Sequence, residues 1–157
     1  MTDRREVEES PCWIAVDPGL QGGMALVRGD DSPVLKPFTT EGEFLNVLES
    51  VPGNAEAIVE EIPPYVGRAI PSSAAFKLGK NYGFEVGALR ALGFRVNLVK
   101  PQKWQAGLGG LRGLEGAARK RRLKDHAQRL FPKVEGLTLK TADALLIFDY
   151  WKNNRVN

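Results

Sequence analysis

The sequence predicts an α/β fold in which helices flank a mixed five-stranded sheet. Short apolar runs bounded by turn residues recur through the first hundred residues, and segments with helical apolar periodicity lie between and after them. The predicted order is three strands, a helix, a strand, a helix, a strand and two helices. Three successive strands favour an antiparallel meander, and the strands that follow helices favour parallel crossovers.

The expected strands are short and stop at turn residues. We expect them over residues 13–16, 22–27, 34–38, 57–60 and 94–99. The first stops at Asp17-Pro18-Gly19, the fourth is halted by Pro63-Pro64, and the fifth follows Gly93, which ends a helix.

We expect helices over residues 41–50, 72–92, 117–130 and 141–151. The first has Phe44, Leu45 and Leu48 on one face. Ser72 and Ser73 are candidate caps of the second. The apolar stripe of this second helix consists of Ala75, Leu78, Tyr82, Val86 and Leu89. Glycines at five positions between 107 and 116 predict a flexible loop before the third helix.

The length of 157 residues and a hydrophobic content of 43% fit one domain with its own core. We expect a disordered lead-in over residues 1–11 and a single domain over residues 12–157. Cys12 is the sole cysteine, which excludes an internal disulfide and a cysteine-rich zinc site. Without an apolar signal segment or a run of about 20 apolar residues, we expect a cytoplasmic protein, or one from an equivalent compartment such as the nucleoid, an organelle or a phage-infected cell.

Charge is strongly segregated along the chain. Residues 1–61 hold 13 acidic and 4 basic side chains, whereas residues 100–133 hold 10 basic and 2 acidic ones. This pattern favours a polyanionic partner for the middle of the chain, although a solvated basic helix face would give the same pattern.

Three carboxylates stand where apolar segments end or begin. Asp17 and Glu60 each follow a predicted buried strand, and Asp143 begins an otherwise apolar helix. A carboxylate in such surroundings is costly unless a cation or a donor satisfies it. Together the three would form an oxygen-ligand site for Mg²⁺ or Mn²⁺. Singly, they could be a turn residue, a solvated strand end and a helix cap.

Four segments, in the same order, resemble the RuvC-type Holliday junction resolvases, which have an RNase H-like fold. IAVDPG at residues 14–19, with GGMA at 22–25, is similar to their opening hairpin, and IVEE at 58–61 to their second motif. SAAFKLGK at 73–80, followed by Gly83, is similar to their long central helix, and ADAL at 142–145 to their final acidic motif. Among the branches of this family, the sequence most resembles the short phage, bacterial and chloroplast forms.

The resemblance implies a crossover junction endodeoxyribonuclease of DNA recombination and repair. It implies metal-dependent hydrolysis of phosphodiester bonds in four-way junctions, with two Mg²⁺ ions or Mn²⁺ as a substitute. Asp17 would bridge the ions, with Glu60 and Asp143 on either side. Lys103 and Lys120 match positions where resolvases place basic residues near the cleaved strand, and Lys100 is a neighbouring alternative.

One position departs from the family pattern. Many relatives have another acid or a histidine three residues before the final aspartate, and this sequence has Lys140 there. A protonated lysine cannot bind a metal, although Lys140 could stabilise charge on the scissile phosphate or lie on the surface. Asp149 is an alternative ligand, but six residues from Asp143 places it on another helix face.

The expected DNA contacts lie in the basic middle of the chain, where side chains bind phosphates with little sequence information. The candidates are Lys100, Lys103, Arg112, Arg119, Lys120, Arg121, Arg122 and Lys124. Tyr65 lies where resolvases often place a residue that enters the junction. Trp104 is a second candidate for stacking, with core packing as the alternative.

Gly79, Gly83 and Gly87 recur every four residues on the long predicted helix. They would allow close approach either of this domain's own sheet or of a second copy across a two-fold axis. The resemblance favours a homodimer.

Two other functions remain open from sequence alone. The chain could bind junctions without cutting them, because of Lys140, or act as an RNase H-like nuclease on another nucleic acid. An ATP-binding actin-like domain is disfavoured because the chain is short and lacks a second phosphate-binding hairpin.

Overall fold

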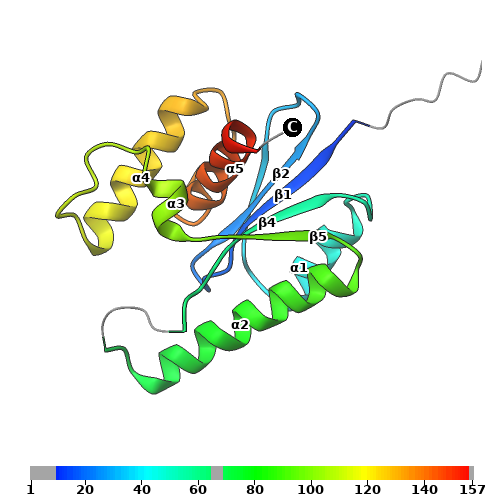
Figure 1. Ribbon diagram of the computed structural model, residues 1–157, viewed down its shortest axis with the longest axis horizontal. Coiled ribbons are helices and arrows are strands. Elements are labelled where there is room, and N and C mark those ends of the chain that lie inside the picture. The colour runs from blue at the N-terminus through cyan, green and yellow to red at the C-terminus, as the bar shows by residue number, and fades with distance from the viewer. Residues whose placement is uncertain (1–9, 65–68, 156–157) are drawn as a thin grey trace, which may run out of the picture.

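Five strands form one mixed sheet in the computed structural model, which describes residues 10–64 and 69–155. The strands are β1 (Cys12–Asp17), β2 (Gly23–Arg28), β3 (Val34–Pro37), β4 (Glu56–Glu60) and β5 (Arg95–Val99). Their order is β3-β2-β1-β4-β5, with β2 antiparallel to β1 and β3, and β4 parallel to β1 and β5 (Figure 1). The predicted meander and crossovers are therefore confirmed.

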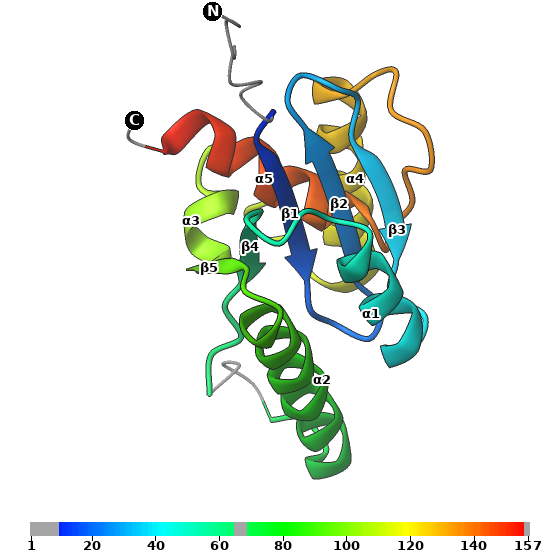
Figure 2. The same cartoon turned by 90° about the vertical axis from the view of Figure 1, so that its right-hand side faces the viewer.

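Helices cover both faces of the sheet, as Figures 1 and 2 show. On one face lie α1 (Glu41–Glu49) and α2 (Ser72–Ala91). On the other lie α3 (Pro101–Gln105), α4 (Gly116–Leu130) and α5 (Ala142–Asn154). The sequence did not predict α3, because one turn is too short to show helical periodicity. Within the described ranges, no helix is both long and apolar enough to cross a membrane.

The strand period of two decides which residues of β1 face each helical layer. Ile14 and Val16 pack in the core beside α1 and α2, whereas Trp13 and Ala15 pack in the core beside α5. Because side chains alternate between faces, Asp17 points to the α5 side.

The same alternation holds in β4. Ile58 belongs to the core on the α5 side, so Glu60, two residues later, shares that side. Val16 is paired with Val59 in the parallel register, and the two strands therefore end at one edge of the sheet. Asp17 and Glu60 thus meet at this edge.

Helix α2 begins differently from the prediction. Its cap is Pro71, and no side chain caps its first turn, so Ser72 and Ser73 are not capping residues. The predicted apolar stripe holds only toward the end of the helix: Val86 and Leu89 are buried, but Ala75 is exposed. The first half of α2 extends past the sheet (Figure 2).

Candidate active site

The three predicted acids converge around one lysine. Asp17 and Asp143 are 7% and 6% exposed, and Glu60 is half-buried. The ammonium Nζ of Lys120 lies 2.5 Å from Asp143 Oδ2 and 3.8 Å from Asp17 Oδ2. The three acids come from three different elements, β1, β4 and α5. Helix α4 supplies the ammonium group that lies near both Asp17 and Asp143.

A close backbone approach positions Asp17. The Gly22 N–H donates to the Gly19 carbonyl at 2.8 Å, closing the turn between β1 and β2. A Cβ at Gly22 would lie 2.2 Å from the Asp17 carbonyl oxygen and 2.8 Å from its carboxyl carbon, so only glycine fits there. On the other side of the turn, Asn81 of α2 donates to the Pro18 carbonyl at 2.7 Å.

Buried hydrogen bonds fix the start of α5 and with it Asp143. Thr141 is fully buried, donates through Oγ1 to the Gly136 carbonyl at 3.1 Å and accepts from the Thr138 N–H at 3.0 Å. Every residue from Ala142 to Phe148 is buried. The first turn of α5 is thus anchored by core packing on all sides, and Asp143 cannot turn to solvent.

Helical periodicity places Lys120 on the inner face of α4. Leu123 and Ala127, three and seven residues later, are the buried residues of this helix. Burial tends to lower the pKa of Lys120, but the nearby carboxylates of Asp143 and Asp17 outweigh it and leave the pKa raised. Lys120 is therefore a persistent positive charge inside the acidic cluster.

One lysine does not balance the negative charge. Burial, and then the charge of Asp143, raises the pKa of Asp17 to about 6. Burial, and then the charge of Asp17, raises the pKa of Glu60 to about 8. Both shifts mean that the ionised carboxylates repel one another in a poorly solvated space. The cluster is short of positive charge.

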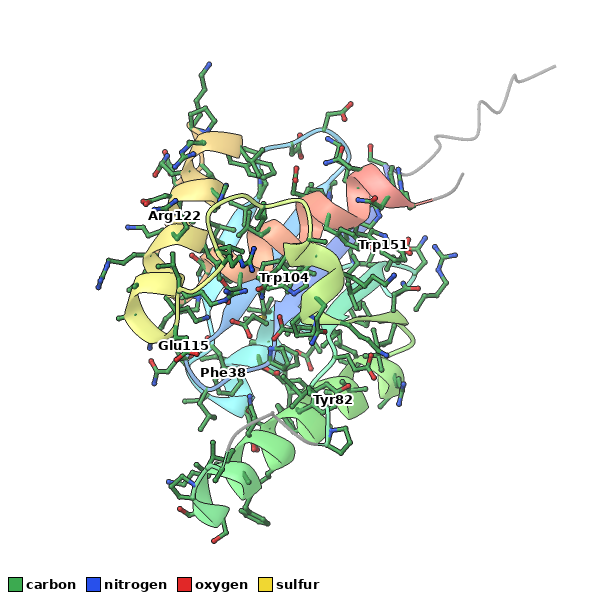
Figure 3. All side chains as sticks on the ribbon, turned by 60° about the vertical axis from the view of Figure 1, so that its left-hand side comes forward. Phe38, Tyr82, Trp104, Glu115, Arg122 and Trp151 are labelled. Atoms are coloured by element: carbon green, nitrogen blue, oxygen red, sulfur yellow. The ribbon has the colours of Figure 1, made fainter. Side chains whose placement is uncertain are left out.

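Glu60 accepts a hydrogen bond that the sequence did not predict. Trp104, buried on α3, donates from its indole Nε1 to Glu60 Oε2 at 2.7 Å. Figure 3 shows Trp104 together with Arg122 on the α5 side of the sheet, and Tyr82 on α2 opposite. From the sequence, Trp104 had two alternative roles, packing in the core or stacking on DNA. In the structure it is a core residue whose polar atom reaches the acidic cluster.

A second interaction that the sequence missed holds α3 against α4. The Arg119 guanidinium donates to the carbonyls of Leu111 and Leu114 at 2.9 and 3.4 Å, and to Gln105 Oε1. Arg119 was predicted to contact DNA, but these three acceptors already engage it. It connects the glycine-rich loop to the elements on either side.

Glu85 is a further buried acid, on the helix layer at the opposite face of the sheet. It lies on α2, is 1% exposed, and neither of its carboxyl oxygens has a hydrogen-bond partner among the described residues. Burial, and then the charge of Asp17, raises its pKa to about 9. A signal was present in the sequence, because Glu85 interrupts the stripe of Tyr82, Val86 and Leu89.

The donor set at the three acids suits a hard divalent cation. Carboxylate oxygens are the preferred ligands of Mg²⁺, and Asp143 Oδ1 is a buried oxygen without a partner in the described part of the chain. As the side chains lie, however, no group of three His, Cys, Asp or Glu residues within 10–64 and 69–155 could hold a metal ion. The oxygen ligands and the excess negative charge of the cluster fit a divalent cation. To bind it, the carboxylates of Asp17 and Asp143 would have to move away from Lys120.

Three other predicted residues lie outside this cluster. Lys140 comes two residues before α5, is exposed, and forms no ion pair with these acids among the described residues. Lys103 is exposed beside inward-facing Trp104. Asp149 accepts from Asn153 Nδ2 at 3.2 Å, a turn further along α5. None of the three contacts the acids.

The remaining predicted DNA contacts lie on the outside of the α3–α4 layer. Lys100, Arg112, Arg121 and Arg122 are exposed, and Lys124 is half-buried. A groove beside α4 is lined by Leu114, Ala118, Arg121, Arg122, Lys124, Asp125 and Leu139. Tyr65 and residues 1–9 of the predicted lead-in fall outside the described residues.

Comparison with solved structures gives the class of fold. The chain is similar to a structure of Thermus thermophilus RuvC, with a TM-score of 0.58, 20% identity and coverage of 90% of this chain and 95% of the other. It is also similar to T. thermophilus RuvC in complex with a Holliday junction substrate, with a TM-score of 0.62, 17% identity and coverage of 91% and 95%. No protein-family model matches the sequence, and no curated protein matches it significantly.

The protein therefore has the RNase H-like fold of the RuvC structures. The resemblance that the sequence motifs indicated is confirmed at the level of the fold, over nearly the whole length of both chains.

Proposed function

We propose that this protein is a metal-dependent endonuclease that cuts branched DNA, with the four-way junction as its substrate. The observation that carries the proposal is the convergence of Asp17, Glu60 and Asp143 around Lys120 at one edge of the sheet. The fold supports it, because one structure of the same fold is described as a complex with a Holliday junction substrate.

The residues divide the chemistry between them. Asp17, Glu60 and Asp143 would hold the divalent cations, which supply an activated water and stabilise charge on the leaving oxygen. Lys120, whose raised pKa keeps it protonated, would stabilise negative charge on the scissile phosphate once it leaves Asp143. Burial of Asp17 and Asp143 limits water around the reacting atoms.

The basic residues of α4 and its neighbours would bind the phosphates of the substrate. Arg121 and Arg122 are exposed and directly follow Lys120 on the same helix. They lie on other faces of α4 than Lys120, so they would contact phosphates along the outside of the helix, away from the acids themselves.

A cleavage assay tests the proposed activity. Four-way junction, linear duplex and RNA–DNA hybrid would each be incubated with Mg²⁺, with Mn²⁺ or with a chelator. We expect metal-dependent cutting of the junction, and we expect Asp17→Asn to reduce it to background while junction binding remains. Asp30→Asn, the same change in an exposed turn, is the matched control. Cutting that survives Asp17→Asn would refute the assignment, and preferential cutting of the hybrid would redirect the substrate.

A second candidate is a junction-binding module without catalysis. The ion pair between Lys120 and Asp143, together with the lack of a ready three-ligand group among the described residues, favours it. It predicts that the wild-type protein binds junctions with equal affinity in metal and in chelator and cuts none of them.

We also propose that two copies associate through α2. The glycine stripe of Gly79, Gly83 and Gly87 is exposed, and a Cβ at any of the three would meet nothing within 4 Å. The stripe therefore does not pack on this domain's own sheet, which was one of the two alternatives. Phe76, one turn before the stripe, is 70% exposed. A two-fold pair would cover this surface and would suit symmetric cutting of two strands.

Sedimentation tests the association. We expect wild type to sediment as a dimer and Gly83→Leu as a folded monomer, because the larger side chain separates the helices. Gly42→Leu, an exposed helical glycine on α1 with nothing closer than 4.0 Å, should leave the dimer intact. A monomeric wild type would exclude the dimer, and circular dichroism would show whether each variant is folded.

A further inference from the structure

The indole of Trp104 contacts an acid of the candidate active site from inside the core. Trp104 is 3% exposed, and it belongs to the core cluster that also contains Leu111, Leu123 and Leu145. A side chain packed this tightly keeps one orientation, so its Nε1 is a fixed donor 2.7 Å from Glu60 Oε2.

The backbone that carries Trp104 is held on both sides. The Lys103 N–H donates to the Lys100 carbonyl at 2.9 Å, and the Leu108 N–H donates to the Gln105 carbonyl at 3.0 Å. Gln105 also accepts from Arg119 of α4 through its side chain. The donor is therefore positioned by α3, the following loop and α4 together.

The chemistry of the indole differs from that of Lys120. An indole has a single N–H donor, so it can hold one oxygen of Glu60, and in this structure that oxygen is Oε2. It also carries no charge, and a cation that binds Glu60 does not have to displace it. Lys120, in contrast, competes with any cation for Asp17 and Asp143.

We propose that Trp104 is a positioning residue: its indole holds Glu60 Oε2 toward α3 and leaves Oε1 as the oxygen that binds the cation. This inference rests on the proposed nuclease function. Residues that hold a metal ligand through its second atom orient that ligand, and losing one of them typically reduces metal affinity or activity about 10- to 100-fold.

The test compares two Trp→Phe substitutions in the full-length protein. Trp104→Phe keeps an aromatic ring in the core and removes the donor. Trp13→Phe is the matched control, because Trp13 is 7% exposed in the same core cluster and its ring packs against Phe148, away from the acids. Mn²⁺ binding to the free protein, measured by electron paramagnetic resonance, needs no cleavage.

We expect Mn²⁺ affinity to fall about 10- to 100-fold in Trp104→Phe and less than about 2-fold in Trp13→Phe. Cleavage should show a lower kcat and an unchanged KM for the junction. In nuclear magnetic resonance spectra, the Trp104 indole N–H signal, assigned by its absence in Trp104→Phe, should shift in Glu60→Gln and on addition of Mg²⁺.

The outcomes separate the two proposals. Wild type that binds Mn²⁺ and cuts junctions, with Trp104→Phe equal to Trp13→Phe, overturns the positioning role alone. Wild type that binds no Mn²⁺ overturns both. If Trp104→Phe does not fold, 3-benzothienylalanine at position 104 keeps the shape of tryptophan with sulfur in place of the N–H, and the same comparison applies.

Discussion

The two faces of the sheet bury acidic side chains in opposite ways. On the α5 side, Asp17 and Asp143 have the Lys120 ammonium, and Glu60 has the Trp104 indole. On the α2 side, Glu85 has neither a cation nor a donor among the described residues. Burial raises the pKa of Glu85 to about 9 and that of Glu60 to about 8, so both acids keep their protons at neutral pH in the absence of a further cation. Only Glu60 has a donor and lies in a cluster with a cation. The difference indicates which face is built for chemistry.

Removing Lys120 should make the first face resemble the second, with the largest effect. We expect Lys120→Met to lower cleavage about 100- to 1,000-fold, as expected for the loss of one group that stabilises a developing charge. It should also lower the unfolding temperature in chelator, because two buried carboxylates lose their counter-charge, and added Mg²⁺ should restore it. Lys36→Met, on β3 and exposed, is the control for lysine removal. A Mg²⁺ response equal in both variants would contradict this view of the site.

The second prediction concerns the pH dependence of stability. With its pKa raised from the usual 4.5 to about 9, Glu85 keeps its proton in the folded state over a range where the unfolded chain releases it. Stability should therefore fall as pH rises, by about 1.4 kcal/mol per unit between these values and by about 3 kcal/mol at pH 7. Glu85→Gln should remove this contribution and be more stable than wild type at pH 8.

Urea unfolding at pH 5.5, 7 and 8.5 measures the effect of Glu85→Gln. Glu49→Gln, at an exposed position of α1, is the matched control and should follow wild type. Parallel pH profiles for Glu85→Gln and wild type would show that Glu85 is ionised in the folded protein.

The smallest predicted effect concerns which face binds DNA. Changing Arg121 and Arg122 together to Ala should reduce the slope of log affinity against log salt by about 2, because each phosphate contact contributes about 0.9. Arg28 and Arg90, exposed elsewhere on the protein, form the control pair. If the slope falls equally in both double variants, the arginines of α4 do not make specific contacts with the phosphates of the DNA.

Much of the fold and the acidic cluster could be predicted from the sequence, for a physical reason. The strand period of two and the turn at Asp17-Pro18-Gly19 are local properties, and they place Asp17 on the face where Asp143 lies. The same locality explains the errors in the prediction. Helix α3 has only five residues, and the capping role of Ser72 and Ser73 depended on a first turn that Pro71 begins instead.

The contacts around the acids could not be predicted, because they join residues that are distant in the sequence. Trp104 and Glu60 are 44 positions apart, and Lys120 and Asp143 are 23 positions apart. In the sequence, Arg119 is indistinguishable from the other basic residues of its helix. In the structure, it donates hydrogen bonds to three acceptors. Composition predicts charge, but only packing decides which charges are already used.

The Arg119 interactions have a consequence for how the protein opens locally. Native proteins open in cooperative units, and a unit is defined by the bonds that must break together. Arg119 lies in the first turns of α4, next to Lys120 in the sequence, and its side chain binds Gln105 of α3 and Leu111 of the glycine-rich loop. The hydrogen bonds of this one side chain therefore connect all three segments. We expect an opening that releases Arg119 to loosen the backbone that carries both the indole donor of Glu60 and the ammonium beside Asp143. The acids would then repel one another, which favours rapid reclosure or capture of a cation from solution.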